Sequence, residues 1–156
     1  MPDFPPPRLV LDTNTVMALW FFEDPRLARL RDAIEHHAPP LLARADTLEE
    51  LRHVLAYRQF GASPDRQRDI LDAYTARVTL AEPMDPTDGD DPLSVPALPT
   101  CRDRDDQKFL EVARDGRASH LLSRDKVLLK LHRHRLVRGL FAVVTPESFA
   151  ATLESD

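Results

Sequence analysis

The sequence predicts an α/β fold in which a mainly parallel sheet is covered by helices on both faces. Short unbroken apolar runs, such as Leu9–Leu11, are typical of strands buried on both faces. Segments with the apolar spacing of helices separate these runs, as in parallel sheets. The chain has 156 residues, of which 42% are hydrophobic, and this is enough for one compact domain with a single core.

In the first half of the chain, the predicted strands and helices alternate. The strand over 9–11 stops at Asp12, which begins a run of helix-capping side chains before the apolar segment 16–20. The further elements expected in this half are a helix from Asp24–Pro25 to about 37, a strand over 41–45, a helix capped by Asp46 or Thr47 and ending at Gly61, a helix from Ser63–Pro64, and a strand over 78–80.

Between Glu82 and Pro99 the composition changes, with five prolines and five acids but no basic residue. We expect a loop over 82–102, within a domain spanning 9–150 and flanked by a proline-rich tail at 1–8 and a tail at 151–156. The further elements expected are a helix over 103–116, a strand over 120–122, a basic amphipathic helix over 126–138, a strand over 141–144 and a terminal helix opened by Pro146.

Charge and cysteine content narrow the function classes. With 21 Lys and Arg against 26 Asp and Glu, the net charge of -5 provides no overall attraction for polyanions. The single cysteine, Cys101, excludes an internal disulfide and a cysteine-rich metal site. No apolar run approaches the ~20 residues of a membrane span, and residues 1–7 lack the pattern of a signal peptide. We therefore expect a cytoplasmic protein.

Several carboxylates are predicted to meet at one edge of the sheet. Asp12 and Asp125 each follow a buried strand, and ligands of open α/β sheets bind beyond the carboxyl ends of the strands. On the helix starting at 103, a spacing of three residues places Asp103 and Asp106 on the side facing this crevice. Glu50 lies at the boundary of the apolar stripe of its helix and can lean inward.

Each of these acids also has a purely structural explanation, because Asp commonly caps a following helix and Glu is a common surface charge. Together they are harder to explain in this way. Carboxylates ~5 Å apart repel by roughly 3 kcal/mol per pair at an effective dielectric of 20, so a converging cluster needs a cation or raised pKa values. Oxygen ligands without Cys or His favour Mg²⁺ or Mn²⁺ over zinc.

The segments that carry these acids resemble the four acidic motifs of the PIN domain. They are LVLDTN at 9–14, ELRHVL at 50–55, DRDDQKFLEVA at 103–113 and LLSRD at 121–125. The resemblance spans about 9–146 and is closest to the toxins of toxin–antitoxin systems that are related to VapC. It implies a three-layer α/β/α sandwich with a central, mainly parallel sheet. It also implies a metal-dependent endoribonuclease that leaves 5′-phosphate and 3′-hydroxyl ends, acting as the toxin of a type II toxin–antitoxin system.

The resemblance further implies a role for each matching residue. The ligands of one or two Mg²⁺ or Mn²⁺ ions would be Asp12, Glu50, Asp106 and Asp125, with Asp103 as an accessory ligand. The polar residues that orient these acids or a metal-bound water would be Thr13, Asn14 and Ser123. Either Glu50 or Asp125 would position or deprotonate the attacking water. The residue before the last acid is usually small in the family. Here it is Arg124, whose side chain would contact a phosphate or face solvent.

A basic stretch follows the third acidic motif. Between 114 and 138, eight Lys and Arg residues stand against two acids, a local net charge of +6. This stretch would guide an RNA backbone toward the metal; a solvated helix face, or a surface for an acidic segment of a partner, are open alternatives. The residues expected to contact RNA are Arg124, Lys126, Lys130 and Arg133.

The partners expected are an RNA substrate, a cognate antitoxin protein and further copies of the chain in a homodimer or higher homo-oligomer. The aromatic residues Trp20, Phe21 and Phe22 are expected in the core or at a dimer surface rather than as a base-stacking platform.

Two other functions remain open. One is a phosphatase or phosphotransfer domain with Asp12 as phosphoacceptor, although no second Asp follows two residues on. The other is a non-catalytic PIN-fold protein that binds RNA or a partner.

Overall fold

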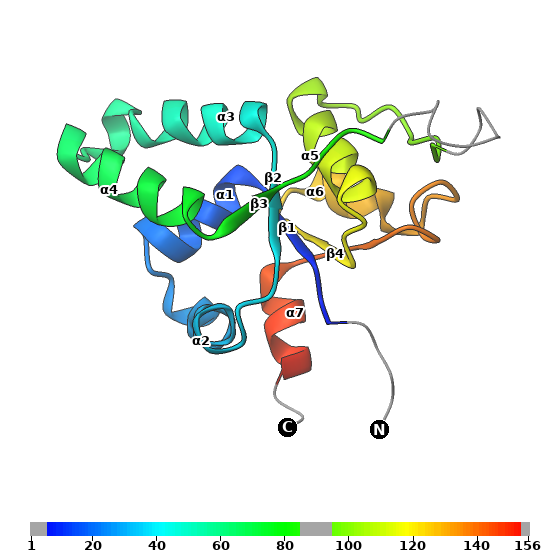
Figure 1. Cartoon of the computed structure of the whole chain (residues 1–156), viewed down its shortest axis with the longest axis horizontal. Helices are drawn as coiled ribbons and strands as arrows, with labels where there is room; N and C mark the ends of the chain where they lie inside the picture. The colour runs from blue at the N-terminus through cyan, green and yellow to red at the C-terminus, as the bar shows by residue number, and fades with distance from the viewer. Residues whose placement is uncertain (1–5, 85–94, 154–156) are drawn as a thin grey trace.

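The structure is a computed structural model that describes residues 6–84 and 95–153. Five short strands form one sheet at the centre of the molecule (Figure 1). The strands are β1 (Leu9–Leu11), β2 (Leu41–Ala43), β3 (Val78–Leu80), β4 (His120–Leu122) and β5 (Ala142–Val144). Their order in the sheet is β3-β2-β1-β4-β5, and every neighbouring pair is parallel. The predicted parallel sheet is therefore confirmed.

Helices cover both faces of this sheet. One face carries α1 (Thr13–Val16), α2 (Ala28–His37), α3 (Ala45–Leu55), α4 (Pro64–Thr75) and α7 (Pro146–Thr152), and the other carries α5 (Arg104–Asp115) and α6 (Lys126–Leu129). The three layers match the predicted α/β/α sandwich. Among the described residues, no helix has both the length and the hydrophobicity that a membrane crossing requires.

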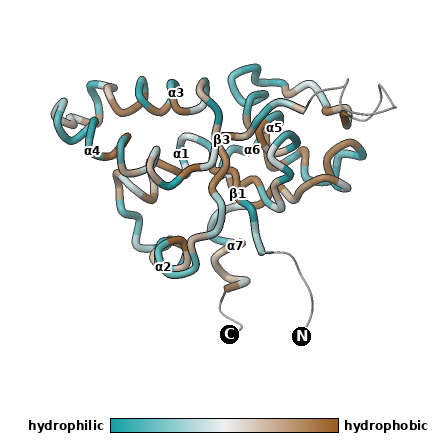
Figure 2. Tube along the Cα trace, viewed as in Figure 1, coloured by the Kyte–Doolittle hydropathy of each residue, from teal (hydrophilic) through white to brown (hydrophobic). Residues whose placement is uncertain are grey.

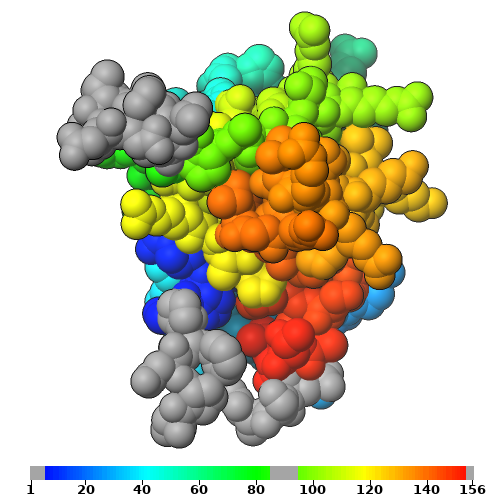
Figure 3. Space-filling model, turned by 90° about the vertical axis from the view of Figure 1, so that its right-hand side faces the viewer, coloured from blue at the N-terminus to red at the C-terminus, as the bar shows by residue number. Residues whose placement is uncertain are grey.

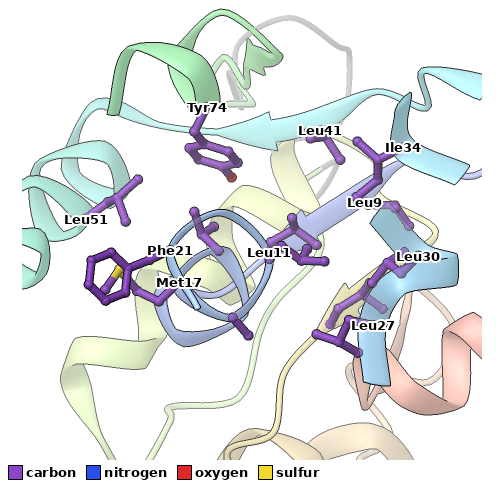
Figure 4. Packing of buried hydrophobic residues seen from close by; sticks show 14 of the residues in the cluster. Leu9, Leu11, Met17, Phe21, Leu27, Leu30, Ile34, Leu41, Leu51 and Tyr74 are labelled. Carbon is purple, nitrogen blue, oxygen red and sulfur yellow. The ribbon is translucent and has the colours of Figure 1, made fainter. Parts of the chain in front are cut away.

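The two layers of helices enclose two hydrophobic clusters because side chains alternate along each strand. Leu9 and Leu11 point into the first cluster, where Met17, Phe21 and other residues pack around them (Figure 4), whereas Val10 belongs to the second. Hydrophobic residues accordingly concentrate on the strands and on the helix faces turned toward them (Figure 2).

Side-chain caps begin most of the helical segments, as the sequence predicts. The residues whose side chains accept a hydrogen bond from the first turn are Asp12, Asp24, Ser63, Asp103, Asp125 and Thr145. The helix after β2 departs from the prediction, because Arg44 rather than Asp46 or Thr47 occupies its N-cap position. Thr47 lies one turn in, where its hydroxyl accepts a hydrogen bond from the Arg44 amide at 3.0 Å.

Gly61 ends a separate short turn rather than α3. The helix stops at Leu55, and a 3-10 turn over Arg58–Phe60 follows before Gly61, whose φ of +61° lies in the left-handed region. This conformation costs glycine little and reverses the chain toward α4. The turn brings two aromatic residues close to the site described below.

The prediction of a single basic helix over 126–138 is wrong. The helix α6 ends at Leu129, and a 3-10 turn over Lys130–Arg133 leads to His134, which has an extended backbone. The His134 ring Nδ1 accepts a hydrogen bond from the Leu136 amide at 3.1 Å. A backbone amide that bonds to a side chain is not available to a helix, so the chain turns toward β5. Figure 3 shows this segment, in orange, on one face of the molecule.

The described residues of both predicted tails include ones that contact the fold. The Arg8 amide donates to Ser119 Oγ at 2.9 Å and its guanidinium donates to the Gly116 carbonyl at 3.0 Å, so residue 8 belongs to the fold. At the other end α7 extends to Thr152, and Leu153 packs against the core. Residues 1–5 and 154–156 lie outside the described residues.

The acidic loop lies partly outside the described residues, at 85–94. Its last part lies against α5, because the backbone amide of the buried Cys101 donates a hydrogen bond to Gln107 Oε1 at 2.5 Å. The Gln107 side chain in turn donates to the Pro99 carbonyl at 3.1 Å. These contacts hold the end of the loop against the first turn of α5, and Cys101 itself packs in the second hydrophobic cluster.

The strand order marks where a ligand can bind. The chain moves from β1 to β2 and β3 on one side and then crosses to β4 on the other. Side chains at the carboxyl ends of β1 and β4 therefore border a crevice that the two diverging connections leave open.

Candidate active site

A pocket of about 350 Å³ lies at the carboxyl ends of β1 and β4. It is lined by the five acids Asp12, Glu50, Asp103, Asp106 and Asp125, by Thr13 and Asn14, and by Val54, Tyr57, Gln59, Phe60 and Phe109. Four separate stretches of sequence contribute these acids. The structure thus brings together all five carboxylates named from the sequence.

Asp12 is the most buried of these acids, with 4% of its surface exposed. Its Oδ1 accepts a hydrogen bond from the Thr15 amide at 2.9 Å, which caps α1, and its Oδ2 accepts one from Ser123 Oγ at 2.5 Å. Burial raises the pKa of the Asp12 carboxyl, and the hydrogen bonds from Ser123 and Thr15 oppose that rise. A cation in the pocket would favour the ionised form.

Ser123 connects the two acids at the strand ends. Its hydroxyl donates to Asp12 and accepts a hydrogen bond from the Asp125 amide at 2.9 Å. It is completely buried after β4, so this geometry is rigid. The predicted orienting role of Ser123 rests on these two contacts.

Asp106, in the first turn of α5, has the feature that best fits a bound cation. Its Oδ2 is buried and has no hydrogen-bond partner among the described residues. Burial raises its pKa to about 7, and the negative charges of Asp125, Asp103 and Asp12 add to the rise. An unpartnered buried carboxylate oxygen is costly unless it is protonated or bound to a cation.

Asp103 and Asp125 combine a structural contact with their place in the pocket. Asp103 Oδ1 accepts from the Asp105 amide at 3.0 Å, and Asp125 Oδ1 accepts from the Val127 amide at 2.8 Å. Each acid therefore caps its helix with one carboxylate oxygen. The structural explanation therefore holds for both residues, and it is compatible with metal binding, since a cap fixes the direction of the carboxylate.

Glu50 is held by residues from two other elements. Its Oε2 accepts a hydrogen bond from the Thr13 hydroxyl, and its Oε1 accepts one from the Lys108 ammonium at 2.8 Å. Only 27% of the Glu50 side chain and 16% of the Lys108 side chain are exposed. Glu50 is therefore an oriented, charge-paired group rather than a surface charge.

Sequence reasoning missed Lys108. On the α5 helix it lies roughly 200° around the axis from Asp106, so helical spacing does not place it on the same side. It reaches Glu50 because α3 and α5 pack side by side. The local spacing therefore gave no signal for this pairing.

Of the residues expected to contact RNA, Arg124 is held by protein instead. Its guanidinium donates to Asp24 Oδ2 at 2.9 Å and to Glu147 Oε1 at 2.8 Å, linking the 3-10 turn over Pro25–Leu27, which Asp24 caps, to α7. Two carboxylates thus hold the guanidinium, and 32% of the Arg124 side chain is exposed. Lys126, Lys130 and Arg133 are exposed, and no ion pair involves them among the described residues.

The donor set of the pocket fits a hard divalent cation. The polar groups that line it are mainly carboxylates, joined by the Thr13 hydroxyl and by the Asn14 and Gln59 amides, and the buried Asp106 oxygen still lacks a partner. Within 6–84 and 95–153, no three Asp, Glu, His or Cys side chains have already converged to hold an ion. The acids line the pocket rather than form a finished cage.

Comparison with known protein families matches residues 8–127 to the PIN domain. This covers more than half of the chain, so the chain belongs to the PIN-domain family, which has a nuclease-type fold. Comparisons with curated proteins and with solved structures give no match.

Proposed function

We propose that the protein is a metal-dependent endoribonuclease that hydrolyses phosphodiester bonds of RNA with Mg²⁺ or Mn²⁺. The observation that carries this proposal is the acidic pocket at the carboxyl ends of β1 and β4 in a PIN domain. The raised pKa and unpartnered oxygen of Asp106 support a cation there. A pocket with several carboxylates would otherwise repel its substrate phosphate.

Each acid has a proposed task in the reaction. Asp12, Asp106 and Asp125 would hold the cation, with Asp103 as an accessory ligand. A bound divalent ion supplies positive charge to the scissile phosphate and lowers the pKa of a water molecule. Glu50, held by Lys108 and Thr13 at its two oxygens, would orient that water and accept its proton.

The experiment that tests the proposal is cleavage of mixed single-stranded RNAs in Mg²⁺, Mn²⁺ or EDTA. We expect wild-type protein to cut only with metal and to leave 5′-phosphate ends, and we expect Asp12→Asn and Asp125→Asn to be inactive. Asp105→Asn is the matched control, because this exposed acid on α5 does not line the pocket.

Two results would contradict the proposal. One is unchanged cleavage in EDTA, and the other is full activity in both pocket variants when circular dichroism shows that they fold. A phosphorylated Asp12 after incubation with a phosphate donor would instead support phosphotransfer.

We further propose that the protein is the toxin of a type II toxin–antitoxin system. The support is the resemblance of its four acidic motifs to toxins related to VapC. The partners would be a cognate antitoxin and further copies of the chain. Expression of the wild-type protein in cells should arrest growth, whereas expression of the Asp12→Asn variant should not. The product of an adjacent small reading frame, expressed together with the wild-type protein, should relieve the arrest. Growth unaffected by the wild-type protein would favour a role in RNA processing.

A further inference from the structure

Three aromatic rings meet beside the carboxylate pocket, and we call Phe22, Tyr57 and Phe60 the aromatic rim. The rings of Tyr57 and Phe60 are nearly parallel, with an interplanar angle of 19° and centroids 6.0 Å apart. Phe22 meets Phe60 edge-on at 5.4 Å. Tyr57 and Phe60 line the same pocket as the five acids.

Two of the three rim side chains are exposed although they are apolar. Phe22 is 54% and Tyr57 is 48% exposed, whereas Phe60 is partly buried against the core. Of the aromatic residues expected in the core or at a dimer surface, Phe21 lies in the core and Trp20 is partly buried against it. Single exposed apolar side chains are normal on a protein surface, but adjoining ones at a pocket indicate a binding site.

Backbone hydrogen bonds fix the chain that carries the rim. Tyr57 precedes and Phe60 ends the 3-10 turn that Gly61 closes, and the Phe60 amide donates to the Tyr57 carbonyl at 3.1 Å. The amide of Phe22 donates to the Met17 carbonyl at 2.8 Å. The buried Phe21 ring contacts Phe60, with centroids 5.7 Å apart, and so supports the rim from the core. A backbone fixed in this way reduces the conformational entropy that a bound ligand must remove.

We propose that the aromatic rim is a nucleobase subsite that stacks a base of single-stranded RNA beside the scissile phosphate. This inference rests on the proposed function and names the form of RNA that the site takes. A nucleotide joins a phosphate to a flat aromatic base, and the pocket has acids suited to a cation next to flat aromatic side chains. Asn14 and Gln59, in the same pocket, have amide groups that can hydrogen-bond to base edges.

The charge of the pocket strengthens this inference. Its carboxylates repel an RNA backbone, and the net charge of -5 adds no general attraction. Stacking of a base on an aromatic ring does not depend on charge and tolerates different bases. A base in a duplex is already stacked and paired, so the rim should favour single strands over double strands.

The test measures binding of a fluorescently labelled short single-stranded RNA to the Asp12→Asn protein in Mg²⁺, so that cleavage is not needed. In this background we expect Tyr57→Ala and Phe22→Ala each to weaken binding by on the order of 10-fold, and Tyr57→Phe to bind normally. Leu80→Ala is the matched control, since this exposed apolar side chain on β3 does not line the pocket. An RNA with an abasic position at the stacked nucleotide should bind weakly and be insensitive to Tyr57→Ala.

The outcomes separate this inference from the proposed function. Unchanged affinity in Tyr57→Ala and Phe22→Ala, or equal losses with normal and abasic RNA, would overturn the subsite even if the protein cuts RNA. Rim-dependent binding without any cleavage would leave the subsite standing and reject the nuclease. If sedimentation shows a dimer that Phe22→Ala dissociates, while RNA affinity stays unchanged, the rim is an interface between copies of the chain.

Discussion

Asp106 and Glu50 illustrate two ways in which this pocket keeps a carboxylate in place. Asp106 is surrounded by other acids, and burial together with their charges raises its pKa to about 7. Glu50 instead has a cation of the protein itself, Lys108, at 2.8 Å. The charge of Asp106 is therefore expected to depend on pH, whereas Glu50 is held by its neighbour.

Replacing Asp106 by Asn should raise the stability of the metal-free protein at pH 8. In the native state the Asp106 carboxyl keeps its proton up to about pH 7, whereas in the unfolded chain it releases the proton near the ordinary Asp pKa. The stabilisation of the native state by this proton is therefore full below about pH 4 and is lost as pH rises through about 7. The full pKa shift corresponds to roughly 4 kcal/mol, and partial exposure reduces the expected gain to about 1–2 kcal/mol. Thermal unfolding at pH 5 and pH 8 measures this; a gain that is equal at both pH values would contradict it.

Replacing Lys108 by Met should lower kcat for RNA cleavage by roughly 10- to 100-fold, because Glu50 loses the contact that orients it. Lys108→Arg should retain most activity, since it can still pair with the carboxylate. The free energy of unfolding should change by about 1 kcal/mol or less. Kinetics of both variants test this, and similar losses in Met and Arg would show that the charge is not what matters.

At the level of elements, the segment from β4 to β5 separates two kinds of basic residue. Arg124 bridges the 3-10 turn over Pro25–Leu27 and α7 through Asp24 and Glu147. Lys126 begins α6 and Lys130 follows it, and both are exposed. Arg124 is thus engaged within the fold, whereas these two lysines face solvent.

This difference predicts opposite effects in two variants. The double variant Lys126→Ala/Lys130→Ala should weaken RNA binding and make it less dependent on salt, because fewer counterions are released, and it should unfold like wild type. Arg124→Ala should unfold more easily, by about 1 kcal/mol, and should bind RNA almost normally. Binding measured over a salt series, with thermal unfolding of each variant, distinguishes them; a reduced salt slope in Arg124→Ala would contradict the assignment.

At the scale of the whole molecule, the sheet order collects residues that are more than 100 positions apart. Asp12 and Ser123 touch because β1 and β4 are neighbours in register, with Leu11 opposite Leu122. The pocket is thus part of the folded core rather than a separate loop. A ligand that binds these acids should therefore stabilise the entire domain.

Mg²⁺ or Mn²⁺ should raise the unfolding temperature of the wild-type protein, and EDTA should remove the gain. A cation present at 100 times its Kd would stabilise the native state by about 2.7 kcal/mol, since it binds the folded pocket. Asp106→Asn should respond less, and Asp105→Asn should respond like wild type. Equal gains in all three proteins would mean that the metal binds elsewhere.

The local pattern of the chain was sufficient to predict the five strands, the caps at Asp12, Asp103 and Asp125, and the parallel sheet. Strand alternation and helix capping depend on residues within a few positions of each other, so they can be read along the chain. The acids were predicted for the same reason, because each follows or begins an element whose direction is known.

Only the tertiary structure decided which side chains meet. The pairing of Lys108 with Glu50, the bridge from Arg124 to Asp24 and Glu147, and the aromatic rim all join residues from different elements. The His132 ring Nδ1 likewise accepts a hydrogen bond from the Val143 amide of β5 at 3.0 Å, which ties the end of the basic segment to the sheet. Such contacts depend on packing and register between elements that are distant in sequence, and no local spacing records them.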